Sequence, residues 1–467
     1  MTSAPFFLRR LRDLGVLTAA TEQALLTDGV LTLADYHLAV AERRSSVADK
    51  AIHAALPRLN EDITPLTLGR GSEVLEAFAA TMAARCPEVT GVQPSGDVRR
   101  FEPLLENLPL VGHSAAPPAS IAAVATLPGV TSILHRTGRR VIVQGQGHEV
   151  DVRISTPDEF GSLLFTTTGP PPHVLEIHRR RGPRISASEE QVYAQAGLTY
   201  LPPELRGSPG AIEAAVEGRL PRLVTRADIR GDLHMHTTFS DGQNPLSEMV
   251  HACAALGYEY IAITDHSEHA AASRTLTAEL LARQRDQIAR LRQEYPRLAI
   301  LHGIEADILP DGRIDCPDDV MASLDIVLAS LHDRAGQDGR QLTTRCLRAI
   351  RHPLVTMITH PMNQLVGHRE GYDLDFDAIY EAAAETGTVL EIDGAPGHLD
   401  LDGEHARAAI GAGVTVSIDS DCHRARSLER QMRFGVGTAR RGWVEPRHVL
   451  NARPLAQVLA FIAQKRA

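Results

Sequence analysis

The chain has 467 residues, of which 43% are hydrophobic and 23% are charged, and its formal net charge is −10 at pH 7. These proportions are typical of a globular protein and exclude a chain that is mostly disordered. The sequence has no run of the ~18 apolar residues that a membrane-spanning helix needs. The basic N-terminus also lacks the apolar stretch of a signal peptide.

Five cysteines are spread along the chain without a CxxC pair: Cys86, Cys253, Cys316, Cys346 and Cys422. An odd number at irregular spacing argues against a disulfide scaffold and against a cysteine-based zinc module. We therefore expect a protein of the reducing cytoplasm that has no membrane partner.

The sequence pattern divides the first half of the chain into three regions. Residues 1–80 show helical periodicity interrupted by short polar turns. Residues 81–200 mix short apolar runs with turns, and three segments predict strands: VTSILHR, RRVIVQG and HEVDVRIS. Residues 201–230 form a linker rich in Pro and Gly with one short helix. We predict a helical region, a small α+β domain and a linker in front of a second domain at 231–467.

From residue 231 onward, apolar strands alternate with helical stretches. The expected strands are YIAITD, LAILHGIE, LDIVLASLH, VTMITH, TVLEID and VTVSIDSD. Continuous apolar strands in a repeated βα pattern predict a parallel sheet or barrel that is buried on both faces. Polar residues follow each apolar run, which is where an α/β barrel places its active site.

Charge and histidine content differ between the halves. Residues 1–230 hold 24 basic and 25 acidic residues, which leaves 24 basic and 33 acidic residues for the remaining 237. Seven histidines lie in the first part and 14 in the second. A multi-metal site and a solvated acidic surface both explain this composition.

The residues at the ends of the expected strands distinguish a metal site from a solvated acidic surface. Six consecutive strands are each followed by a potential metal ligand, and the set is His234, His236, Asp241, His266, Glu305, His332, His360, Asp421 and His423. In an extended segment residues i and i+2 point to the same side, so His234 with His236, and Asp421 with His423, can each present two ligands to one cavity. Six such strand ends in a row favour a metal centre over isolated structural histidines.

The types of ligand limit which metal ions and which reaction the site can support. Imidazole and carboxylate without thiolate suit Zn, Mn or Fe better than Ca or Mg. Nine ligands are too many for one ion, so we expect two or three divalent ions that share a bridging carboxylate. Such clusters polarise phosphoryl oxygens and activate water, which predicts phosphate ester hydrolysis, with amide or lactone hydrolysis as the competing reaction.

These residues also carry a family resemblance. DLHMHTTFSDG, AITDHSEH, GIEADIL, ASLH, THP and SDCH resemble the motifs of the PHP (polymerase and histidinol phosphatase) domain. RGDLHMHT, LEIDGAPGHLDL and GVGTARRGWVEPRHVLNARPL resemble the PHP domain of bacterial family X DNA polymerases. The resemblance implies an α/β protein whose C-terminal distorted (β/α)7 barrel follows a helical segment and a degenerate nucleotidyltransferase-like α+β palm.

The resemblance also implies a role for each ligand. One metal would be held by His234, His236, Glu305 and Asp421, which we predict as the catalytic set. Glu305 would bridge to a second metal on His332 and His360, and Asp241, His266 and His423 would hold the third. Asp393 stands where this branch of the family usually has Asn. The further histidines His269, His302 and His398 have no role in this scheme.

The first half resembles a palm that has lost its catalytic carboxylates. VIVQGQGHEVDVRIS resembles the segment with the third catalytic aspartate, here Asp151, but the preceding Asp-x-Asp pair is replaced by Glu106 and Asn107. Nucleotidyl transfer needs grouped carboxylates to hold two ions. Arg99 and Arg100 match the Arg pair of the family. Residues 1–80 resemble its hairpin-helix or thumb-like region only faintly.

Three functions remain open at this stage. The first is a 3'-5' exonuclease or DNA 3'-end-processing enzyme that acts in DNA repair after its polymerase activity was lost. The second is a phosphomonoesterase of the histidinol-phosphatase type, acting on a small phosphate ester. The third is a non-catalytic DNA-repair scaffold. The neutral charge balance of residues 1–230 counts against the first, because DNA binding is normally basic and dependent on salt.

Overall fold

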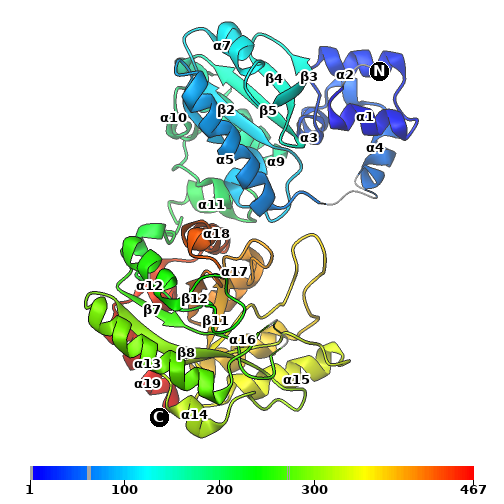
Figure 1. Ribbon diagram of the computed structural model, residues 1–467. Coiled ribbons are helices and arrows are strands. Elements are labelled where there is room, and N and C mark those ends of the chain that lie inside the picture. Colours follow the sequence, from blue (N-terminus) through cyan, green and yellow to red (C-terminus); the bar gives the residue numbers. More distant parts are fainter. Residues whose placement is uncertain (1–3, 60, 62–64, 183, 271, 273) are drawn as a thin grey trace. The chain divides into compact units, whose positions relative to one another are not determined.

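The computed structural model describes residues 4–59, 61, 65–182, 184–270, 272 and 274–467. The chain divides into two compact units, Met1–Leu220 and Pro221–Ala467. Each unit has its own sheet (Figure 1).

The first unit begins with short helices. These are α1 (Phe6–Asp13), α2 (Ala19–Thr27), α3 (Leu33–Ala41) and α4 (Lys50–Ala55), followed by the longer α5 (Leu68–Arg85). Helices α2, α3 and α5 begin after Thr18, Thr32 and Thr67, whose hydroxyl oxygens accept a backbone N–H of the first turn. The apolar faces of α1–α3 pack together and against Leu134 and Ile142 of the sheet. Figure 1 shows the same helices gathered beside β3.

The sheet of the first unit is mixed and has the strand order β1-β2-β5-β4-β3. Its strands are β1 (Thr90–Pro94), β2 (Pro109–His113), β3 (Val130–Arg136), β4 (Arg140–Gly145) and β5 (His148–Ser155). Strands β2 and β5 are parallel, and the other pairs are antiparallel. The remaining helices are α6 (Gly96–Arg100), α7 (Pro117–Val124), α8 (Phe160–Thr168), α9 (Pro171–Arg181), α10 (Glu189–Gln195) and α11 (Ala211–Val216).

The second unit is a nearly closed barrel of seven parallel strands. They are β6 (Gly231–Asp232), β7 (Tyr260–Ile263), β8 (Ala299–Asp307), β9 (Ile326–Ser330), β10 (Met357–Ile358), β11 (Val389–Asp393) and β12 (Val416–Asp419), paired in sequence order. A parallel bridge between Met235 and Cys422 joins the segments that follow β6 and β12. This closes most of the gap between the first strand and the last.

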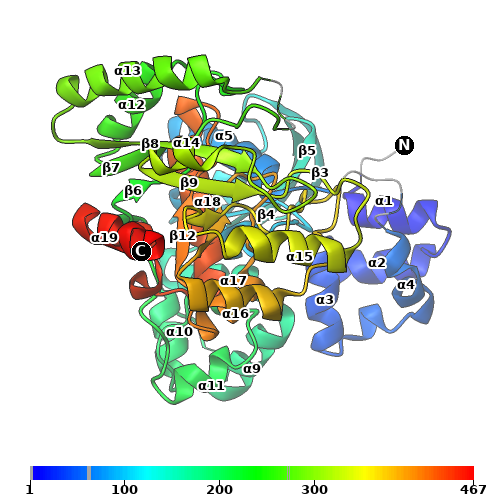
Figure 2. The same cartoon turned by 90° about the horizontal axis from the view of Figure 1, so that it is seen from below.

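Helices follow these strands and surround the barrel, with the last helix packed against its inner cluster (Figure 2). They are α12 (Leu246–Ala255), α13 (Ala278–Glu294), α14 (Asp318–Ala322), α15 (Gly339–Ile350), α16 (Phe376–Thr386), α17 (Gly403–Gly411), α18 (Leu428–Arg441) and α19 (Leu455–Arg466). The predicted fold class, an α/β chain with a C-terminal seven-stranded barrel behind a helical segment and a mixed sheet, is confirmed.

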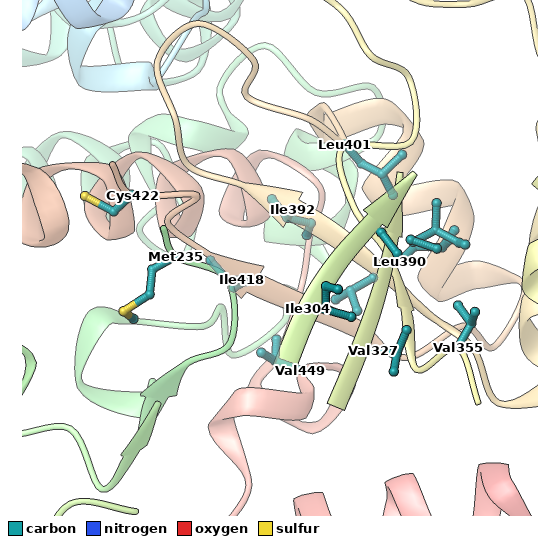
Figure 3. Packing of buried hydrophobic residues seen from close by; sticks show 14 of the residues in the cluster. Met235, Ile304, Val327, Val355, Leu390, Ile392, Leu401, Ile418, Cys422 and Val449 are labelled. Carbon is teal, nitrogen blue, oxygen red and sulfur yellow. The ribbon is translucent and has the colours of Figure 1, made fainter. Parts of the chain in front are cut away.

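Alternation along the strands builds two apolar layers. On β9, Val327 and Ala329 belong to the outer layer between strands and helices, whereas Ile326 and Leu328 belong to an inner cluster. Figure 3 shows outer-layer side chains such as Ile304, Leu390 and Ile418. The inner cluster packs against α19 and fills the start of the barrel. Polar side chains are therefore left for the far end of the inner face.

Candidate metal centre

The side chains that point into the barrel change from apolar to polar along each strand. On β9 the inward series runs Ile326, Leu328, Ser330 and then His332, and on β8 the inward Glu305 alternates with the outward Ile304 and Ala306. Carboxyl ends of parallel strands meet at one end of a barrel, so these polar side chains converge there. Each of the nine predicted ligands has a ligand atom within 3.5 Å of another member of the set.

Four ligand atoms lie close together in the first group. The Nε2 atoms of His234 and His236 lie 3.1 Å apart. Asp421 Oδ1 lies 3.5 Å and 3.1 Å from these two nitrogens. Glu305 Oε2 lies 3.5 Å from each of them. Ligands about 2.1 Å from a tetrahedral zinc ion are about 3.4 Å apart. The atoms of His234, His236 and Asp421 have this spacing and can face one ion, and Glu305 Oε2 approaches the two histidines of the same group.

Glu305 connects this group to a second one. Its Oε1 lies 3.0 Å from His360 Nε2 and 3.4 Å from His332 Nε2, while its Oε2 lies 2.9 Å from His266 Nδ1. The carboxylate therefore faces imidazoles through both oxygens. This is the position expected of a bridging ligand.

The third group gathers around Asp241. Its Oδ1 lies 3.2 Å from His423 Nε2 and 3.5 Å from His266 Nε2. His266 thus presents one ring nitrogen to Glu305 and the other to Asp241. His236 also lies against this group, with its ring stacked 4.3 Å from the rings of His266 and His423.

Several buried atoms at this site have no hydrogen-bond partner, which is rare for buried polar groups. They are His236 Nδ1, Asp241 Oδ1, His266 Nδ1, Glu305 Oε2 and His360 Nδ1. Asp241 Oδ1, His266 Nδ1 and Glu305 Oε2 are among the converging atoms, whereas His236 and His360 face the centre with Nε2. Converging imidazole and carboxylate atoms that lack hydrogen bonds are what divalent ions of the Zn, Mn or Fe type need. The residues present therefore fit a cluster of such ions.

The protonation states also suit metal ligands. Burial alone would raise the pKa of Glu305, but the imidazoles of His234 and His332 outweigh burial and hold it well below its usual range. Burial and the neighbouring His266 lower the pKa of His236 to about 3. Glu305 is then an anion and His236 a neutral imidazole with a free lone pair.

Two carboxylates that the sequence did not single out orient the ligands from behind. Glu391 on β11 accepts a hydrogen bond from His234 Nδ1 at 2.7 Å, and it also accepts the backbone N–H of His360 at 2.8 Å. Asp307 on β8 accepts His332 Nδ1–H at 2.7 Å. Carboxylates in this position fix the tautomer and the orientation of a metal-binding imidazole. The available signal was an acidic residue within an apolar strand, as for Glu391, or at its end, as for Asp307.

Two ligands occupy the left-handed backbone region, with φ of 27° at His360 and 45° at Asp421. Residues other than glycine are held there at a cost of about 1–3 kcal/mol each, and such positions cluster at functional sites. The surrounding barrel thus fixes both ligands in strained conformations.

Other polar residues near the strand ends have different roles. Asp265 accepts hydrogen bonds from Thr237, Ser240 and Gln284 and shapes the loop that carries His236. His269 pairs with Asp315 at the surface.

The first unit uses Asp151 in a buried ion network. Arg140 donates from Nε to Asp151 Oδ1 and from Nη2 to Oδ2, both at 2.9 Å. Arg153 donates to the same carboxylate at 2.8 Å, and both arginines also donate to Asp35 of α3. Burial would raise the pKa of Asp151, but the two guanidinium groups hold it below its usual value. Both oxygens of this aspartate are therefore engaged by arginine.

The Arg pair of the first unit is also engaged within the protein. Arg99 donates to Glu189 at 2.7 Å and to Thr168 at 3.0 Å. Arg100 donates to the carbonyl oxygen of Thr168 and to Asp97. These contacts tie α6 to α8 and α10.

A cavity of about 440 Å³ lies between the segment that precedes Asp241 and the start of α13. Its lining includes Phe239, Arg274 and Arg283, and Arg274 donates to the carbonyl oxygen of Gly242, the residue after Asp241. An aromatic ring and two guanidinium groups therefore line a cavity that one hydrogen bond ties to the loop of Asp241.

Comparison with known proteins shows which family and which proteins this chain is similar to. Residues 232–392 match the model of the PHP domain. The DNA polymerase/3'-5' exonuclease PolX of Bacillus subtilis is 37% identical over 389 residues, which cover 79% of this chain and 68% of the relative. A probable phosphatase of Caldanaerobacter subterraneus is 30% identical over 41% of this chain and 75% of its own length.

Among solved structures, the histidinol phosphate phosphatase of Lactococcus lactis, complexed with zinc, L-histidinol and phosphate, matches 46% of this chain and 93% of its own. Its identity is 16% and its TM-score 0.36, so this likeness carries no functional argument.

The fold, the site and the domain match define a PHP-type metal-dependent phosphoesterase. The chain belongs to the family of bacterial family X DNA polymerases that carry a PHP domain. Within the described part of the chain, helices with the length and hydropathy of a membrane span are absent.

Proposed function

We propose that this protein is a 3'-5' exonuclease or DNA 3'-end-processing phosphoesterase whose polymerase activity has been lost. The observation that carries the proposal is the extent of the similarity. The Bacillus subtilis relative matches 79% of the chain, whereas the second unit, 221–467, is little more than half of it. The similarity to a DNA enzyme therefore extends into the first unit.

The ion network around Asp151 supports the loss of polymerase activity. Two-metal nucleotidyl transfer needs carboxylate oxygens that are free to bind ions. Arg140 and Arg153 engage the carboxylate of Asp151, and Glu106 and Asn107 stand where the Asp-x-Asp pair is expected. A carboxylate neutralised in this way is a poor metal ligand.

In this proposal the nine ligands hold two or three divalent ions, of which Zn and Mn are the first candidates. Such ions polarise a phosphoryl oxygen and lower the pKa of bound water. The protein fixes the ligands through Glu391 and Asp307 and keeps His236 neutral. It presents Phe239, Arg274 and Arg283 in a cavity next to the loop of Asp241.

That cavity favours a nucleic acid strand. Proteins that bind single strands combine aromatic side chains that stack on bases with basic groups that contact phosphates. The partner is therefore proposed to be a DNA end, in the cytoplasm.

A small-molecule phosphomonoesterase is the second candidate. It is favoured by the probable phosphatases of Caldanaerobacter subterraneus and Syntrophotalea carbinolica, which are 30% and 29% identical over 41% and 42% of this chain. These matches span less than the length of the second unit. They therefore leave the retained first unit without a role.

One paired assay tests both candidates. A 5'-labelled single-stranded oligonucleotide and a panel of phosphomonoesters would be incubated with Mn(II) or Zn(II) at low and moderate salt. Stepwise shortening of the oligonucleotide, weakened by salt and lost in the double variant His234→Ala/His236→Ala, is expected. Hydrolysis of monoesters alone would favour the second candidate. Turnover retained in the double variant would contradict the assignment of the centre.

A further inference from the structure

A fourth group of potential ligands adjoins the centre on the β11–β12 side. It consists of Asp393, His398 and Asp421, whose ligand atoms lie within 4.8 Å of one another. Asp393 ends β11, His398 lies in the loop after it, and Asp421 follows β12. Only Asp421 belongs to the nine predicted ligands.

Asp393 is a buried carboxylate with an unused oxygen. Its side chain is 0% exposed. One oxygen accepts the backbone N–H of Ala395 at 2.6 Å, whereas Oδ2 is buried and has no hydrogen-bond partner. Leaving such an atom unsatisfied costs about 1–3 kcal/mol, more when the group is charged. A bound cation removes that cost.

His398 is held in the tautomer that a metal requires. Its Nδ1–H donates to the carbonyl oxygen of Gln364 at 3.1 Å, which leaves the lone pair on Nε2. Its ring stacks on that of His360 at a centroid distance of 5.3 Å. The imidazole is therefore fixed from two sides and faces the centre.

We propose that Asp393, His398 and Asp421 form an additional divalent cation site that shares Asp421 with the pair His234 and His236. Two carboxylates and one neutral imidazole balance the charge of a divalent ion, and the mixture of oxygen and nitrogen suits Mn or Zn. Three protein ligands leave positions for water or a substrate oxygen. The site explains why this chain carries a carboxylate at 393 and a histidine at 398, neither of which the three other groups use.

Counting ions tests the site without reference to turnover. The full chain, stripped with a chelator, would be dialysed against rising Mn(II), and bound Mn would be measured by mass spectrometry. The variants are Asp393→Asn and His398→Gln. His302→Gln is the matched control, because His302 is a buried barrel histidine that hydrogen-bonds Gln284 and lies in none of the four groups.

Each of the two variants is expected to bind one Mn(II) fewer per chain than wild type at saturation, and the control is expected to bind the same number. An unchanged number with unchanged dissociation constants in either folded variant would overturn the proposal. A loss of two or more ions would also overturn it, because both residues would then support the shared cluster rather than a site of their own. The count needs no substrate, so it stands apart from the proposed nuclease activity.

Discussion

His234 Nδ1 and Glu391 Oε1 lie 2.7 Å apart, and both side chains are 0% exposed. The glutamate thereby fixes which nitrogen of His234 faces the centre. Its other oxygen accepts the backbone N–H of His360, so one side chain positions two predicted ligands.

Replacing Glu391 with Gln should weaken metal binding while leaving all nine ligands in place. Mutating a residue that hydrogen-bonds a metal ligand from behind typically lowers metal affinity or activity 10–100-fold. We expect a loss of about that size in a Mn(II) titration of the apo protein and in turnover. The variant Glu385→Gln, at an exposed position on α16, should behave as wild type. Equal affinity in both variants would show that Glu391 does not position His234.

The substitution Asp151→Asn should destabilise the first unit. It removes one of the two carboxylates that Arg140 and Arg153 share and leaves Asp35 as their remaining anion. We therefore expect a loss below the about 3–5 kcal/mol that is typical of breaking a buried ion pair outright. Hydrogen exchange across β4 and β5 should speed up accordingly. The exposed Asp158→Asn provides the control. Unchanged exchange, or nucleotidyl transfer by the wild-type chain with a primer, template and Mn(II), would contradict a purely structural Asp151.

Acid should destabilise the first unit through His173. Burial, followed by the nearby Arg206, lowers the pKa of His173 to about 3, and its Nε2 lies 2.7 Å from the hydroxyl of Tyr193. The unfolded chain binds a proton there below about pH 6.5, so stability is lost as the pH falls from 6.5 toward 3.

The expected loss from this residue is about 2 kcal/mol between pH 8 and pH 5. Denaturant unfolding of wild type and of His173→Gln at the two pH values measures it. The variant should show a correspondingly smaller difference. If both proteins lose the same free energy of unfolding, His173 is not the group responsible.

Arg274→Ala combined with Arg283→Ala should weaken binding of a single-stranded oligonucleotide. Each phosphate contact that is lost lowers the salt dependence of affinity, by about 0.7 in the log–log slope per contact for single strands. Fluorescence anisotropy at several salt concentrations gives both quantities. Arg290→Ala, on the exposed side of α13, is the matched control. Hydrolysis of small monoesters should change little, and an unchanged slope would place the strand elsewhere.

Local sequence determined much of this protein. The alternation of apolar strands and helices fixed the barrel class, because continuous apolar runs must be buried on both faces. The i, i+2 spacing of His234 with His236 and of Asp421 with His423 placed pairs of ligands on one side of an extended chain. Chemistry-bearing residues at strand ends then gave the set of nine.

Tertiary structure decided what depends on contacts between residues distant in sequence. Glu391 orients His234 across 157 positions, and Asp35 joins Arg140 across 105. Local sequence patterns cannot predict such pairs, because only strand pairing and helix packing bring the two residues together. The same holds for Asp393 and His398, whose unused ligand atoms turn toward Asp421 only once β11 and β12 lie side by side.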